Sequence, residues 1–126
     1  MFKEVKAFSG FSVDDIELAK AFYGDTLGLV AEENPAGLML KVAGTNGVFV
    51  YPKEDHQAAT YTILNFMVTD IDVAADALIA KGVELETYEG MNQDDKGIAR
   101  GKAANMGPDI AWFKDPAGNI LSILND

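Results

Sequence analysis

Apolar residues recur at helical spacing in two parts of the chain. Residues 71–79 follow the i, i+3, i+4, i+7, i+8 pattern of a helix with one buried face. Residues 16–27 carry a similar stripe. Asp14 and Thr69 are suitable N-cap residues, and Gly28 and Gly82 stand where glycine commonly ends a helix. The sequence therefore predicts two amphipathic helices.

Alternating apolar and polar residues predict strands around these helices. The expected strands cover residues 9–13, 29–32, 38–42, 48–51, 64–68, 83–88, 109–114 and 120–124. Residues 43–47 and 115–119 are rich in turn-forming residues, so each is expected to join two strands as a hairpin.

An internal repeat organises these elements. The segment Val13–Ala19 matches Val68–Ala74, and each copy follows a predicted strand and leads into a predicted helix. We therefore expect one domain over residues 1–126, of class α+β, with two tandem βαβββ modules. Module one covers residues 1–51, a polar linker covers 52–60 and module two covers 61–126. Residues 89–107 form a long loop outside the repeat, and loops of this length are commonly functional.

Composition narrows the possible partners and compartment. The chain has a formal net charge of −10, which disfavours nucleic acid and anionic membranes as partners. It has no cysteine, which excludes disulfides and thiolate metal sites and agrees with a reducing cytoplasm. Residues 1–6 lack the apolar run of a signal peptide. We expect a cytoplasmic protein.

Two motifs carry a family resemblance. Val13-x-Asp15 followed by Ala21-Phe22-Tyr23-x-x-x-Leu27-Gly28-Leu29, together with the hairpin Asp115-Pro116-Ala117-Gly118-Asn119, resembles the vicinal-oxygen-chelate (glyoxalase/bleomycin-resistance/dioxygenase) superfamily. The resemblance implies that the two modules form a cupped half-barrel. In metal-dependent members, His, Gln or Glu side chains on the first and last strands of each module hold a divalent ion that activates substrate oxygens.

The positions that match those ligands carry unsuitable residues. They are Phe8 and Ile63 on the first strands, Ser122 on the last strand of module two, and one of residues 49–51 in module one. Phenylalanine and isoleucine cannot ligate a metal and serine does so poorly, so we expect neither a metal nor another cofactor. His56, the single histidine, lies in the linker and is expected to be solvated.

Strand alternation then predicts what lines the cup instead. The face opposite the helices should carry a mainly apolar and aromatic set with two polar members: Phe8, Ile63, Asn65, Met67, Trp112 and Ser122. Such a lining suits a small organic ligand held by burial and stacking. The alternative is that these residues fill a closed core.

Three functional hypotheses remain open. The first is a binding protein for a small organic molecule, cationic or aromatic, that acts as a homodimer. The second is a lyase, isomerase or dioxygenase-related enzyme with a displaced or absent metal site, using Asp94, Asp95 or Arg100 from the long loop. The third is an interaction module whose cup no longer functions.

Overall fold

The computed structural model describes residues 1–125, which fall into two compact units. The first unit ends at Ala58 and the second begins at Ala59. Each contains one helical segment and one four-stranded sheet. The predicted α+β class and the βαβββ order within each half are confirmed.

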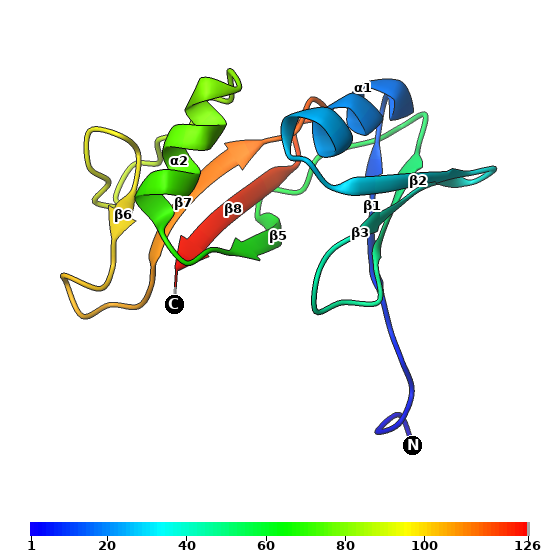
Figure 1. Cartoon of the computed structure of the whole chain (residues 1–126), viewed down its shortest axis with the longest axis horizontal. Helices are drawn as coiled ribbons and strands as arrows, with labels where there is room; N and C mark the ends of the chain where they lie inside the picture. Colours follow the sequence, from blue (N-terminus) through cyan, green and yellow to red (C-terminus); the bar gives the residue numbers. More distant parts are fainter. Residues whose placement is uncertain (126) are drawn as a thin grey trace. The chain divides into compact units, whose positions relative to one another are not determined.

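The first unit builds its sheet around a parallel pair of strands. Its elements are β1 (Ser9–Val13), α1 (Ile16–Lys20), the π-helical turn η1 (Ala21–Thr26), β2 (Val30–Asn34), β3 (Gly37–Lys41) and β4 (Val48–Pro52). The strand order is β1-β4-β3-β2, with β1 parallel to β4 and the other pairs antiparallel. The helical segment lies along one face of this sheet (Figure 1). The apolar residues between them are buried: Val13, Tyr23, Leu38, Leu40, Val48 and Val50.

The second unit repeats this topology. Its elements are β5 (Thr62–Met67), α2 (Ile71–Ala80), β6 (Ala99–Arg100), β7 (Asp109–Lys114) and β8 (Ile120–Asn125), in the order β5-β8-β7-β6. The helix α2 packs on β7 and β8 (Figure 1). The strand residues on that face are fully or almost fully buried: Ala111, Phe113, Leu121 and Ile123.

Both predicted helices are confirmed, but each N-cap lies one residue later than expected. The Asp15 carboxylate accepts hydrogen bonds from the Glu17 and Leu18 amides, and the Asp70 carboxylate accepts one from the Val73 amide. Asp14 and Thr69 were therefore the wrong caps. A capping side chain must reach amides two or three positions ahead of it, and Asp15 and Asp70 stand at that distance from the first free amides.

The predicted strand over residues 83–88 is wrong. Only the Glu86 amide donates to β7, to the Trp112 carbonyl at 2.8 Å. The Gln93 side chain satisfies neighbouring backbone groups, because its Oε1 accepts from the Tyr88 amide and its Nε2 donates to the Glu86 and Gly97 carbonyls. The edge of the sheet is instead β6, which pairs Ala99 with Ile110 and Arg100 with Asp109. This short strand lies within residues 89–107, which the sequence predicted to be a long loop.

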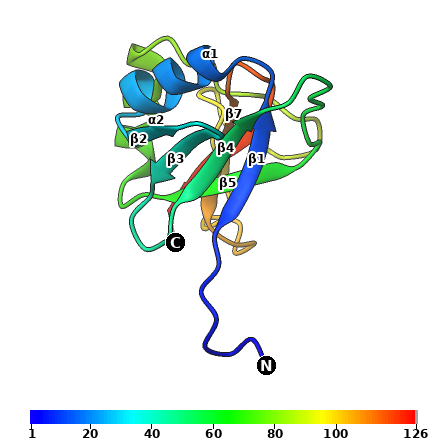
Figure 2. The ribbon, with the colours of Figure 1, turned by 90° about the vertical axis from the view of Figure 1, so that its right-hand side faces the viewer.

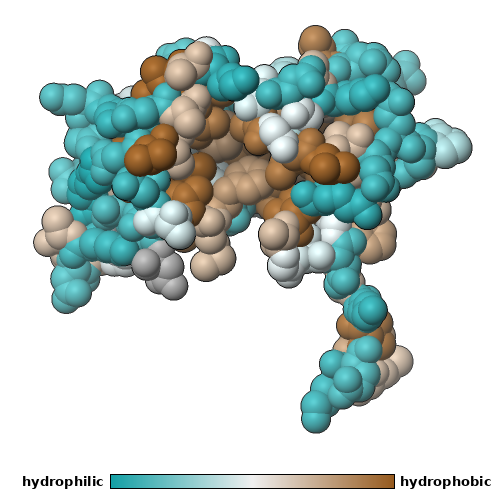
Figure 3. Space-filling view, viewed as in Figure 1, coloured by the Kyte–Doolittle hydropathy of each residue, from teal (hydrophilic) through white to brown (hydrophobic). Residues whose placement is uncertain are grey.

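Residues 1–8 precede β1 and extend away from the sheet of the first unit (Figures 1 and 2). Three apolar side chains of this segment, Phe2, Val5 and Phe8, are exposed by 73%, 60% and 61%. Hydrophobic and hydrophilic residues mix along it on the surface (Figure 3). Within the described part of the chain, none of the helices combines the length and apolarity needed to cross a bilayer.

Candidate functional site

The candidate site lies on the sheet of the second unit, on the side that faces away from α2, here called its far face. The strand register pairs Asn65 with Ser122 and Ser122 with Trp112, so these three residues form one row across β5, β8 and β7. The Ser122 hydroxyl donates to the Asn65 side-chain oxygen. Strand alternation had placed these three side chains on a common face, and the register agrees.

A β-bulge in β5 brings Thr62 onto the far face, although strict alternation would put it on the side of α2. Thr62 pairs with Ile120, whereas Leu64 pairs with Leu121, so Ile63 is the extra residue of the bulge. The bulge brings Thr62 onto the far face, where its hydroxyl accepts a hydrogen bond from the Trp112 indole N–H at 3.2 Å. Thr62 therefore fixes the orientation of the only tryptophan, which is 9% exposed.

A hollow of about 250 Å³ opens beside Trp112, here called the Trp112 hollow. Three aromatic residues, one methionine, one carboxylate and three smaller or aliphatic residues line it: Tyr61, Tyr88, Trp112, Met91, Glu89, Thr60, Thr62 and Ile120. The Tyr88 ring meets the Trp112 ring edge-on, with centroids 5.5 Å apart and an angle of 81°. This arrangement presents aromatic surface next to a negative charge.

Tyr88 also carries a polar atom that the protein leaves unsatisfied. Its hydroxyl oxygen is buried and has no hydrogen-bond partner among the described residues. Burial raises the pKa of Tyr88, Glu86 raises it further, and Lys114 opposes the shift. The phenol is therefore protonated at neutral pH and can donate a hydrogen bond. Native proteins rarely leave such a group unpaired.

An ion-pair network anchors the long loop beside this hollow. The Arg100 guanidinium binds both carboxylate oxygens of Asp72 on α2, with N–O distances of 2.8 and 3.1 Å, and donates to Asp94 at 2.9 Å. Asp94 also accepts from the amides of Lys96, Gly97 and Ile98. These bonds hold residues 94–100 in one conformation.

These contacts bear on the enzyme hypothesis, which used Asp94, Asp95 or Arg100 as acid and base. Hydrogen bonds from Arg100 lower the pKa of Asp72. Burial alone would raise the pKa of Asp94, but the Ile98 amide and Arg100 together lower it. The two carboxylates Asp72 and Asp94 therefore stay ionised in their ion pairs, and Arg100 is occupied by them. The network positions the loop.

Of the predicted ligand-binding residues in this unit, only Trp112 lines the hollow, and Asn65 and Ser122 share its row without lining it. Met67 is 75% exposed at the end of β5, in a row with Leu124 and Ile110. Ile63 is half-buried at the bulge and does not line the hollow. Phe8 belongs to the first unit. Strand alternation did not predict Thr62, Tyr88 and Met91 as site residues, because a bulge and a folded loop bring them to Trp112.

The residues at the positions of the fold family's metal ligands cannot bind a metal ion in the usual way. Ser122 donates its hydroxyl to Asn65, and Phe8 and Ile63 have no donor atom. Within residues 1–125, no three His, Asp or Glu side chains stand close enough together to hold a metal ion. We therefore derive no chemistry through a metal for this chain.

The prediction for His56 is wrong. The imidazole is half-buried, and its Nδ1 forms a 2.6 Å hydrogen bond with the Ser12 hydroxyl on β1. The backbone explains this placement, since the Lys53 amide bonds to the Val13 carbonyl and the His56 amide to the Lys53 carbonyl. The start of the linker therefore folds back onto β1 instead of leaving the imidazole in solvent.

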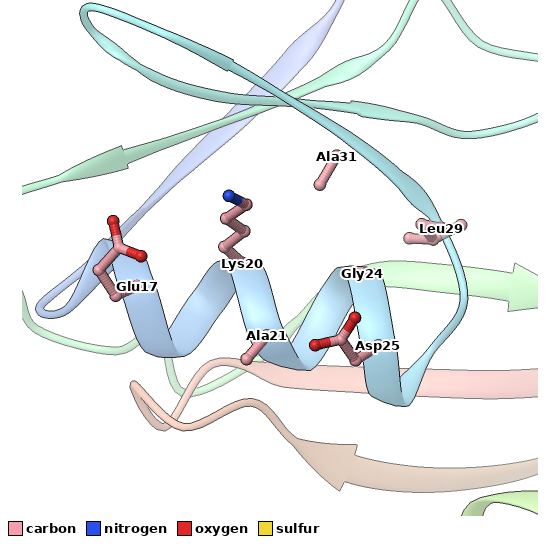
Figure 4. Close-up of a pocket in the computed structure, with 7 residues that line it drawn as sticks. All are labelled: Glu17, Lys20, Ala21, Gly24, Asp25, Leu29 and Ala31. Atoms are coloured by element: carbon pink, nitrogen blue, oxygen red, sulfur yellow. The ribbon is translucent and has the colours of Figure 1, made fainter.

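A second hollow, of about 470 Å³, follows the helical segment of the first unit and has a different character. Figure 4 shows Glu17, Lys20 and Asp25 along the helix, with Lys20 extending toward the strand that carries Ala31. The Lys20 ammonium pairs with Glu33 at 3.1 Å, and this pairing raises the pKa of Lys20. This hollow is lined by three exposed charged residues and contains no aromatic residue.

Comparison with known proteins bears on the fold. No family model and no curated protein matches the sequence. Solved structures match over nearly the whole length of both chains. A glyoxalase family protein from Enterococcus faecalis has 20% identity and a TM-score of 0.69, covering 98% of this chain and 99% of its own. TnmS3, an antibiotic binding protein from Streptomyces sp. CB03234, has 20% identity and a TM-score of 0.68, covering 99% and 98%.

A third structure carries the name of the whole superfamily. The glyoxalase/bleomycin resistance protein/dioxygenase from Alicyclobacillus acidocaldarius has 15% identity and a TM-score of 0.66, with 97% of this chain and 91% of the other covered. Identities this low establish a common architecture and leave activity open. The resemblance seen in the sequence is thus confirmed at the level of structure: the chain has the glyoxalase/bleomycin resistance/dioxygenase fold.

Proposed function

We propose that this protein binds a small organic molecule in the Trp112 hollow, without a metal ion. The observation that carries the proposal is the aromatic hollow beside Trp112, which is lined by Tyr88, a residue whose buried hydroxyl has no partner in the described chain. A ligand that accepts its proton would remove the cost of that unpaired group.

The lining favours a ligand with an aromatic ring or a cationic group. Tyr61, Tyr88 and Trp112 offer ring faces and edges for stacking, and cations are attracted to such faces. Glu89 adds a negative charge at the hollow, within a chain whose net charge is −10. Both features attract a cation and repel an anionic substrate. The likeness to an antibiotic binding protein agrees with a binding role.

Trp112 provides the direct test because it is the only tryptophan. Titration with benzyltrimethylammonium, which combines a ring and a cation, should quench or shift the indole emission. By calorimetry, Trp112→Ala should weaken that binding at least tenfold, since about 1 kcal/mol of stacking is lost together with the buried area. The control Phe113→Leu changes the neighbouring residue, which faces α2, and should leave the affinity within about twofold.

Two results would contradict the proposal. One is an emission spectrum that no member of a panel of aromatic and ammonium compounds changes, with no thermal shift either. The other is one equivalent of zinc, nickel, manganese or iron that survives dialysis, which would favour the enzyme hypothesis with a displaced metal site.

A further inference from the structure

The Trp112 hollow adjoins a second hollow of about 280 Å³ on the same unit, here called the Met106 hollow. Met91 lines both of them, and it is 42% exposed. Ile110 lines the Met106 hollow from β7, two residues before Trp112 on the same strand. Residues two apart share one face of a strand and lie about 7 Å apart. The two hollows are therefore consecutive along β7.

The Met106 hollow is apolar where the Trp112 hollow is aromatic and acidic. Its side chains come mainly from Met91, Ala99, Ala104, Met106, Pro108 and Ile110. Its one cation, Arg100, is occupied by Asp72 and Asp94. The exposed Met106, at 84%, adds apolar surface that water covers when no ligand is present. This chemistry favours a hydrocarbon over a second charged or sugar-like group.

We infer that the ligand is an elongated amphiphile. Its aromatic or cationic head lies against Trp112 and Tyr88, and an apolar arm passes Met91 to reach Ile110 and Met106. The inference rests on the proposed function and specifies the class of molecule. Met91 suits the passage between the hollows because an unbranched thioether side chain adapts to different shapes at low cost.

The loop that lines the Met106 hollow is already ordered between residues 93 and 100, so the apolar arm does not need to order it on binding. Asp94 and Arg100 anchor residues 94–100 to each other and to α2, and Gln93 ties the loop to residues 86 and 88. A wall that is already in place avoids the entropy of ordering a loop on binding.

The test is a series of benzyldimethylalkylammonium ions with alkyl arms of one, six and ten carbons, each used below its micelle-forming concentration. The one-carbon member fills only the Trp112 hollow. If about half of each added methylene is buried, the six-carbon member should bind about thirtyfold more tightly than the one-carbon member. The gain should be smaller from six to ten carbons, where the arm passes the end of the hollow.

Two neighbouring alanines supply a matched pair of variants. Ala104 lines the Met106 hollow and Ala103 does not, and both are exposed, so a larger side chain is accommodated at either position. Ala104→Trp should fill the hollow and abolish the gain with arm length, while the one-carbon member binds as before. Ala103→Trp should keep the full gain. Calorimetry reads each affinity without relying on Trp112 emission.

The outcomes separate the two proposals. If the one-carbon member binds and longer arms add nothing, the amphiphile is wrong and the Trp112 hollow remains a binding site. If arm length helps equally in Ala104→Trp and Ala103→Trp, the arm lies elsewhere and the inference is overturned. If no member of the series binds, the proposed function fails with it.

Discussion

The Tyr88 hydroxyl allows a test in which the sign of the effect is itself informative. Tyr88→Phe keeps the ring that meets Trp112 edge-on and removes only the buried, unpaired oxygen. A buried hydroxyl without a partner costs about 1–3 kcal/mol. The substitution should therefore leave the free energy of unfolding unchanged or raise it by about 1 kcal/mol, which for a chain of this size raises Tm by about 3–4 °C. A bonded tyrosine would give a loss instead.

The assay is urea unfolding followed by Trp112 emission, with Thr62→Val as the comparison variant. That substitution removes the acceptor of the indole N–H while keeping the shape of the side chain, so it should cost about 1–2 kcal/mol. The two variants alter the same site with opposite expected signs. A loss of more than about 1 kcal/mol in ligand-free Tyr88→Phe would refute the reasoning, because it would mean that the hydroxyl is already bonded.

The same variant reports on the ligand. If a bound molecule accepts the phenol proton, Tyr88→Phe should weaken its affinity by about three- to tenfold, the value of one neutral hydrogen bond. Phenacyltrimethylammonium offers a carbonyl oxygen and should show this loss. Benzyltrimethylammonium has no acceptor and should bind Tyr88→Phe and wild type equally.

Three further outcomes are expected. The pKa of Asp72 in the folded protein lies below its ordinary value of 3.8. Its ion pair with Arg100 therefore contributes stability above about pH 4, and this stability is lost as the pH falls through the folded pKa. Asp72→Asn should flatten the profile of Tm against pH between about pH 5 and pH 3, and an unchanged slope would contradict this. Asp115→Ala should lower the free energy of unfolding by about 3 kcal/mol, since the buried carboxylate accepts hydrogen bonds from the Ala117 and Asn119 amides and from the Asn119 side chain. A decrease of less than about 1 kcal/mol would show that the turn is stable without the carboxylate. Sedimentation at micromolar concentration should give twice the 13.5 kDa chain mass, because a chain this small covers apolar surface best as a homodimer; a monomer would refute that prediction.

Periodicity was sufficient to predict most of the fold, because a buried face imposes a repeat on the sequence. The stripe from Ile71 to Ile79 reads directly as α2, and the alternation over residues 109–114 reads as β7. It failed at residues 83–88, where the apolar alternation is present but Gln93 satisfies the backbone instead of a neighbouring strand. A contact from a side-chain amide to the backbone leaves no periodic signal in the sequence.

The candidate site was predictable only where the strands are regular. Asn65, Ser122 and Trp112 share a row because alternation carries across paired strands in register. Tyr88 and Met91 could not be assigned, since the fold of residues 89–107 depends on Asp94 and Arg100 meeting Asp72 from another element. Charged residues in a loop look the same in a sequence whether they are solvated or paired.

The bulge at Ile63 shows why regular alternation misplaces this site. Counting back from Leu64 in steps of two puts Thr62 on the side of α2, because one inserted residue reverses the side of every position before it. The reversal is what brings the Thr62 hydroxyl to the Trp112 indole, and that bond holds the ring at the edge of the hollow. A strict strand would leave the indole N–H without this acceptor. The irregularity therefore belongs to the site, because the extra residue, Ile63, is what keeps Thr62 opposite Ile120 and beside the Trp112 indole.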